Sequence, residues 1–103
     1  MAASNPPVKG VAFKTAICLE DYANPGNFKA NPTIAAGDFK VSIDGGALAN
    51  LATLPAVEPA GSIWVEIDGS TSEMNGDRIM FQCIDQTSPK EWADFSFTIM
   101  TTA

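Results

Sequence analysis

The sequence predicts an all-β domain: an antiparallel, immunoglobulin-like β-sandwich of about seven strands with an extended N-terminal arm. Short segments of alternating apolar and polar residues recur at intervals of about ten residues. Turn residues such as Asn-Pro-Gly and Asp-Gly-Gly separate them, and no segment has helical periodicity. A chain of 103 residues is expected to form one domain, here residues 11–103, preceded by the arm at residues 1–10.

The arm contains Pro6 and Pro7, which favour an extended backbone. Such a segment is ordered only where something holds it. Two interpretations fit equally well: the arm adds an edge strand to its own domain, or it lies across a neighbouring subunit. Both prolines are therefore candidate interface residues.

The first half of the domain is predicted to contain two clear strands. Residues 11–19 alternate with period two, and the turn chemistry of residues 20–27 ends that strand. Pro32 interrupts residues 28–34, which are expected to form an edge piece or an extended loop. Residues 39–44 form the second strand, with Phe39, Val41 and Ile43 facing the core.

A hairpin and a crossing segment follow. Asp44-Gly45-Gly46 predicts a tight turn, with residues 47–51 as the return strand. Residues 52–61 contain two prolines, which discourage both helix and central strand. This segment is expected to cross between strands, held by a few apolar contacts.

The clearest signals lie between Ile63 and Trp92. Residues 63–67 alternate, with Trp64 facing away from the core, and Asp68-Gly69 ends the strand. The spacing from Ser70 to Glu73 is that of a capping box and predicts one helical turn. Asn75 and Gly76 are expected to adopt left-handed conformations after it.

The last two strands are predicted at residues 78–85 and 92–100, joined by a polar hairpin loop. In the final strand, Phe95, Phe97 and Ile99 are expected to face inward.

Cys18 lies on an early strand and Cys83 on a late one, where paired immunoglobulin cysteines also lie. The start of the chain lacks the regions of a secretory signal, so a reducing compartment is expected. Two separate thiols packed as small hydrophobes are therefore favoured over a disulfide.

Most catalytic chemistry is unsupported, so no enzyme, cofactor or metal site is predicted. The chain has no histidine, which excludes Ser-His-Asp centres and His-ligated zinc. Asp44, Asp68, Asp77 and Asp85 fall at loop ends without calcium-loop spacing and predict a solvated acidic rim. The net charge of −6 without a basic cluster argues against nucleic acid, and no apolar run could span a membrane.

Three aromatic residues are candidate interface anchors: Trp64, Trp92 and Tyr22. For Trp64, packing beneath a neighbouring loop is favoured, and exposure as an anchor is the alternative. Trp92, beside the hairpin loop, has the same two interpretations.

Four segments resemble a family of small immunoglobulin-like accessory proteins of tailed bacteriophages: residues 36–47, 50–55, 73–78 and 83–92. The resemblance covers most of the chain from Val11 onward and leaves out the arm. It implies a virion structural protein, assembled in the bacterial cytoplasm and located in the particle.

The leading hypothesis is a capsid decoration or cement protein that binds the major capsid protein or other virion proteins. The resemblance also implies a homo-oligomer. The first alternative is a head-to-tail connector or tail-associated component, present in far fewer copies. A carbohydrate-binding or adhesin module is the alternative from another class, because it would use exposed aromatic platforms such as Trp64, Trp92 and Tyr22.

Overall fold

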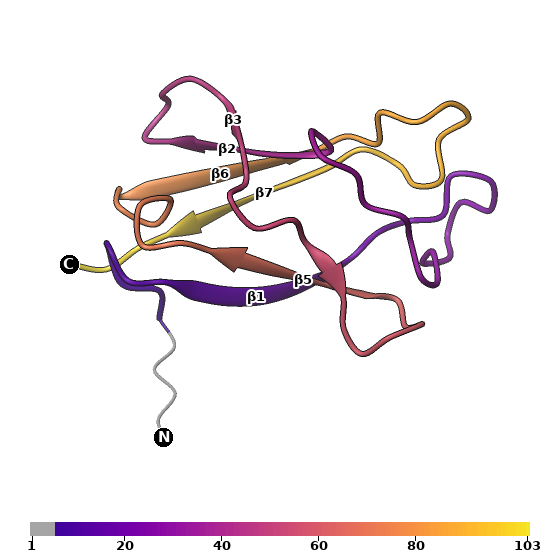
Figure 1. Cartoon of the computed structure of the whole chain (residues 1–103), viewed down its shortest axis with the longest axis horizontal. Coiled ribbons are helices and arrows are strands. Elements are labelled where there is room, and N and C mark those ends of the chain that lie inside the picture. Colours follow the sequence, from indigo (N-terminus) through magenta and orange to yellow (C-terminus); the bar gives the residue numbers. More distant parts are fainter. Residues whose placement is uncertain (1–5) are drawn as a thin grey trace.

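The computed structural model describes residues 6–103, and these residues form seven strands in two antiparallel sheets with no helix (Figure 1). The strands are β1 (Phe13–Cys18), β2 (Phe39–Ile43), β3 (Ala49–Asn50), β4 (Ala56–Val57), β5 (Trp64–Gly69), β6 (Arg78–Cys83) and β7 (Phe95–Met100). One sheet has the order β1-β5-β4 and the other the order β3-β2-β6-β7. The prediction of an all-β, sandwich-like fold is confirmed.

One short strand differs from the sequence prediction, and residues 28–34 agree with it. The crossing segment contains β4, which pairs with β5 through Ala56 opposite Glu66 and Val57 opposite Val65. Residues 28–34 form a loop with one isolated bridge, between Glu20 and Phe28. Pro32 is buried in this loop, so its ring serves as a packing group.

Both sheets contribute to one apolar core. Its buried members are Leu19, Phe39, Val41, Val65, Ile67, Met74, Ile79, Phe81, Cys83 and Trp92. The residues from β2, β5 and β6 alternate along their strands, as expected for sheets with one buried face. Phe81 and Phe97 stack with ring centroids 4.6 Å apart, which joins the core to the edge strand β7.

The described part of the arm folds onto its own domain. Thr102 N–H donates to the Pro7 carbonyl over 2.9 Å, and Lys9 N–H donates to the Thr102 carbonyl over 2.9 Å. Val8 and Thr102 form a parallel bridge. Residues 6–10 thus follow the edge-strand interpretation, while residues 1–5 lie outside the described residues.

The predicted capping box is present between β5 and β6. Glu73 N–H donates to Ser70 Oγ over 3.2 Å, and Ser70 N–H donates to Glu73 Oε1 over 2.9 Å. The second carboxylate oxygen of Glu73 accepts the Ala52 N–H over 2.7 Å. One buried carboxylate therefore holds both its own turn and the start of the crossing segment.

The prediction of left-handed conformations at Asn75 and Gly76 was wrong, because neither residue has a positive φ. Gly76 is buried instead, and a Cβ atom there would lie 2.5 Å from Ile43 Cγ2. Glycine is needed for this close approach of backbone to side chain. Positive φ occurs in the β2–β3 turn, at Asp44 (53°) and Gly45 (81°).

Two further buried carboxylates hold the loops at the other end of the domain. Asp38 accepts the N–H groups of Ala35 and Gln86 over 2.9 and 3.1 Å. Asp85 accepts the N–H groups of Thr87 and Glu91 over 2.9 and 2.7 Å. Buried backbone donors need partners, so these side chains determine the paths of both loops.

Replacing Glu73 with Ala should lower the free energy of unfolding by about 2 kcal/mol or more, because two backbone N–H groups lose a charged acceptor. Urea unfolding followed by tryptophan fluorescence measures the change. Glu58→Ala, at an exposed position, is the matched control and should change stability little. Equal losses in both variants would contradict the assigned role.

The acid limb of the stability curve should depend on Asp85. Burial pushes the pKa of this carboxyl up, but hydrogen bonds from Thr87 and from the backbone of Glu91 and Trp92 outweigh it, so the pKa is lowered. The ionised form then stabilises the fold above the unfolded pKa of about 3.9, and this contribution is lost as the pH falls from that value through the lower pKa of the folded state. Asp85→Asn should be less stable near neutral pH and lose less stability on acidification. Urea unfolding at several pH values tests this, and parallel losses in both proteins would refute it.

Candidate functional site

The outer face of the three-stranded sheet divides into a charged end and an apolar end. Lys14 lies opposite Asp68, and its ammonium is 3.8 Å from the Glu66 carboxylate. At the other end of the strands, Cys18 lies directly opposite Trp64. Strand alternation places both side chains on the face away from the core.

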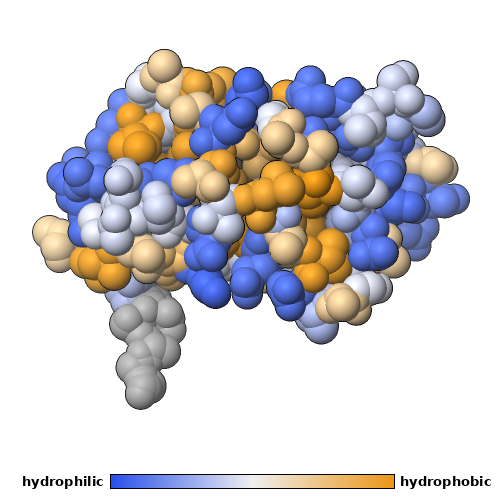
Figure 2. Space-filling model, in the orientation of Figure 1, coloured by the Kyte–Doolittle hydropathy of each residue, from blue (hydrophilic) through white to orange (hydrophobic). Residues whose placement is uncertain are grey.

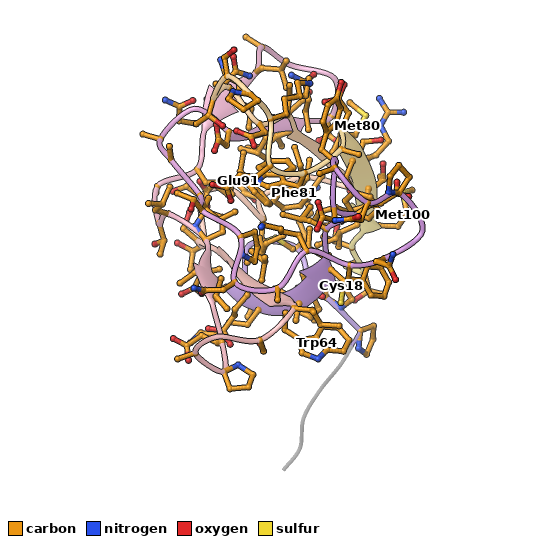
Figure 3. All side chains as sticks on the ribbon, turned by 90° about the vertical axis from the view of Figure 1, so that its right-hand side faces the viewer. Cys18, Trp64, Met80, Phe81, Glu91 and Met100 are labelled. Carbon is orange, nitrogen blue, oxygen red and sulfur yellow. The ribbon has the colours of Figure 1, made fainter. Side chains whose placement is uncertain are left out.

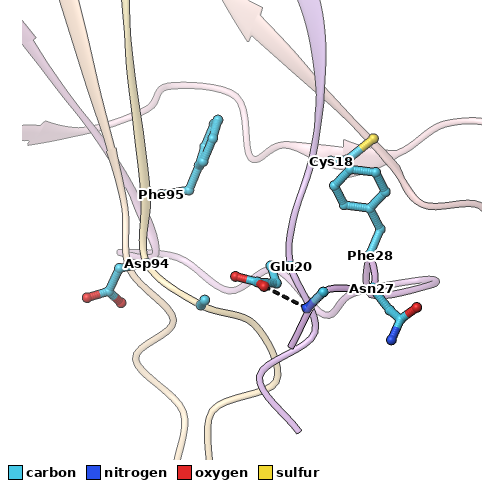
Figure 4. A pocket seen from close by; sticks show the side chains of 8 residues that line it. Cys18, Glu20, Asn27, Phe28, Asp94 and Phe95 are labelled. Carbon is cyan, nitrogen blue, oxygen red and sulfur yellow. Dashed lines mark hydrogen bonds between the residues drawn. The ribbon is translucent and has the colours of Figure 1, made fainter. Parts of the chain in front are cut away.

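Trp64 is exposed, at 46% of its surface. Figure 3 shows Trp64 and Cys18 at the same end of the molecule, with Trp64 projecting outward. The ring of Phe28, 57% exposed, lies beside Cys18 in Figure 4. We call Cys18, Phe28 and Trp64 the Trp64 patch. The favoured interpretation of the sequence, in which Trp64 packs beneath a neighbouring loop, was wrong, because nearly half of its side chain is exposed.

The patch continues into a pocket of about 310 Å³ between the end of β1 and the start of β7. We call it the edge pocket; its lining includes Cys18, Glu20, Asn27, Phe28, Asp94 and Phe95. In Figure 4, Phe95 stands on one side and Cys18 and Phe28 on the other. The walls are thus aromatic and apolar, while two carboxylates lie at the rim.

Both rim carboxylates already have partners in the chain. Glu20 accepts the Gly26 N–H over 2.8 Å, which closes the Asn24-Pro25-Gly26 turn. Asp94 pairs with Lys90 Nζ over 2.7 Å. The acidic groups therefore shape the pocket, and the apolar walls offer the free surface.

The two cysteines are free, and they lie in different environments. Cys83 is in the core, where burial raises the pKa of its thiol to about 12. Cys18 is half-buried on the outer face of β1 and lines the edge pocket. Separate thiols, the favoured interpretation of the sequence, are what the structure contains.

The other predicted interface residues lie in different places. Trp92 is fully buried; its indole N–H donates to the Thr33 carbonyl over 3.3 Å. It therefore offers no surface to a partner or a sugar. Tyr22 is 56% exposed on the loop after β1. Pro6 is exposed and Pro7 half-buried beside Thr102, at the end of β1 opposite the Trp64 patch.

Sequence reasoning missed Phe28 and did not foresee the exposure of Phe95. Phe28 was part of a segment without a regular pattern, so nothing indicated its direction. Phe95 was expected inward and lies opposite the buried Cys83, but it is 38% exposed, since it stands at the start of the strand and lines the edge pocket. The pattern of β7 gave its inward face correctly for Phe97 and Ile99.

A second apolar area belongs to the β3–β4 connection. Figure 2 shows apolar side chains gathered near the middle of the face that this connection crosses in Figure 1. Leu54, half exposed, and Leu51 line a pocket of about 200 Å³ there. This pocket is smaller than the edge pocket and lacks exposed aromatic rings.

Within residues 6–103, no group of three or more Cys, Asp or Glu side chains is placed to hold a metal ion. The same residues include no helix of the length and apolarity that a membrane span requires. Comparison with known proteins finds no matching family model, no matching curated protein and no matching solved structure.

The exposure of the two thiols predicts selective labelling. N-ethylmaleimide should modify Cys18 in the native protein and leave Cys83 unmodified, because only the thiolate reacts and only Cys18 is accessible. Intact-mass spectrometry should show a single adduct before unfolding and a second after it. Cys18→Ser should remove the native adduct; equal labelling of both thiols in the folded protein would contradict the placement.

Proposed function

We propose that the chain is a structural protein of a tailed-bacteriophage particle, a head decoration or cement protein that binds the major capsid protein through the Trp64 patch. The observation that carries the proposal is this exposed patch, which continues into the edge pocket. Exposed aromatic side chains beside a pocket are typical anchors of protein interfaces. The sequence resemblance to accessory virion proteins indicates the kind of partner.

The order of the strands supports an immunoglobulin-like layout within the sandwich. The sheet β1-β5-β4 corresponds to strands B, E and D of that layout, and β3-β2-β6-β7 to C′, C, F and G. No strand of the described residues occupies the position of strand A beside β1. The edge pocket lies on this open side, between β1 and β7.

The size of the patch indicates how it would be used. The exposed parts of Trp64 and Phe28 amount to roughly 200 Å², and burying them would contribute about 5 kcal/mol at most. Association itself costs roughly 4–15 kcal/mol. The patch would therefore serve as the centre of a larger contact that includes the lining of the edge pocket.

Particles of the encoding phage provide the test. Quantitative mass spectrometry of purified particles should find on the order of hundreds of copies of the chain, as expected for a shell protein. About six or twelve copies would overturn the decoration role in favour of a head-to-tail connector or tail component. Absence from the particle would overturn both.

The binding surface is tested by adding purified variants to particles that lack the chain. Trp64→Ala should reduce bound copies roughly tenfold or more at fixed concentration, because it removes the central anchor. Leu54→Ala, which truncates a side chain of similar exposure on the β3–β4 connection, is the matched control. Equal binding of both variants, at equal thermal stability, would refute the assignment to the Trp64 patch.

A further inference from the structure

Strand β7 has an open hydrogen-bonding edge. Among residues 6–103 it pairs only with β6, and the bond from Thr101 N–H to the Asp77 carbonyl shows that the backbone groups of odd-numbered residues face that neighbour. The backbone groups of even-numbered residues therefore point the other way. Thr102 shows the same alternation: its N–H and carbonyl point away from β6 and form hydrogen bonds with the arm. The same groups of Ser96, Thr98 and Met100 have no strand beside them in the described residues.

The other sheet edges carry features that discourage strand pairing. β3 and β4 are two residues long, and Pro55 precedes β4 directly. β1 carries a charged side chain, Lys14, as its second residue. β7 has six residues, none of them charged and none a proline. A long, uncharged, apolar edge strand is the kind of edge that pairs with another strand.

We propose that β7 pairs antiparallel with β7 of a second copy of this chain, forming a closed dimer in which two four-stranded sheets become one. The inference does not rest on the proposed function. The chain has a net charge of −6, yet β7 contributes none of it, so two copies meet where like charges are fewest. Pairing consumes the edge on both copies, which stops growth at two.

The arm limits the register. Continuous sheet faces require that even-numbered residues lie opposite even-numbered residues. Since the arm occupies the edge at Thr102, the partner strand is restricted to Ser96–Met100. Pairing over this range places Thr98 opposite its own copy at the two-fold axis and Ser96 opposite Met100. Exchange of both backbone bonds at each even-numbered position gives about six hydrogen bonds.

Side chains on the outer face fit this register. An apolar hollow of about 380 Å³ lies over the sheet, and its lining includes Leu48, Met80, Ser96 and Thr98. Met100, at 64%, is the most exposed large apolar side chain described, and Figure 3 places it on the same side as Met80. In the dimer, Met100 of the partner lies next to Ser96, at the border of this hollow. A flexible methionine side chain can fill such an irregular apolar hollow, which supports a second copy as the occupant.

Sedimentation velocity from about 10 μM to about 1 mM tests self-association by mass action. The wild-type protein should shift from monomer to dimer and go no further. Thr98→Lys should raise the dissociation constant roughly tenfold or more, because two ammonium groups meet at the axis. Thr53→Lys, an exposed change of the same charge away from β7, is the matched control and should dimerise as the wild type does.

A charge-swap experiment tests the register. Thr98→Lys mixed with Thr98→Glu should restore a dimer, while each variant alone stays largely monomeric. The amide protons of Ser96, Thr98 and Met100 should exchange more slowly as wild-type concentration rises, and those of β1 should not. The restored mixed dimer and the slowed amide exchange both require the contact between two folded copies. A variant that fails to fold would therefore show neither.

Three results would overturn the inference. The first is a monomer at the highest concentration without concentration-dependent amide protection. The second is a dimer that survives Thr98→Lys unchanged, which would locate the contact elsewhere. The third is a dimer that disappears when residues 1–5 are removed. That result would mean that the arm of the second copy, and not its β7, makes the contact.

Discussion

The fold depends on carboxylates, three of them buried, that accept backbone N–H groups in turns and loops. Two of the seven strands have only two residues, so much of the backbone cannot satisfy its donors within the sheets. Asp38, Asp44, Glu73 and Asp85 each accept N–H groups of other residues in turns or loops. Asp44, for example, accepts the Arg78 N–H over 2.9 Å and so joins the end of β2 to the start of β6. Acidic residues that looked like a solvated rim in the sequence are thus partly structural.

The sequence was informative where a local pattern determines the structure. Alternation located the five longer strands, and the spacing of Ser70 and Glu73 predicted their reciprocal hydrogen bonds. It could not predict β4, because a two-residue strand exists only through its pairing with β5. It also could not decide between burial and exposure for Trp92, which depends on contacts with Phe39 and Thr33 far away in the chain.

The candidate surface was predictable only in part. The alternation of β5 indicated that Trp64 faces away from the core. That no loop covers its side chain is seen only in the structure. Phe28 joins it through the path of a long loop, which no periodic pattern describes. The edge pocket requires the termini of β1 and β7, separated by more than 70 residues, to lie close together. Such non-local proximity follows from topology, and a single sequence contains no direct sign of it.

The bonds between Pro7 and Thr102 bring the two ends of the described chain together at one pole of the sandwich, on the left in Figure 1. β1 runs away from that pole and β7 returns to it, so the edge pocket lies toward the opposite pole. A fusion or a surface tether at either terminus would therefore leave the Trp64 patch facing outward. The same geometry means that segments fused to both ends of the described chain would extend from the same side of the molecule.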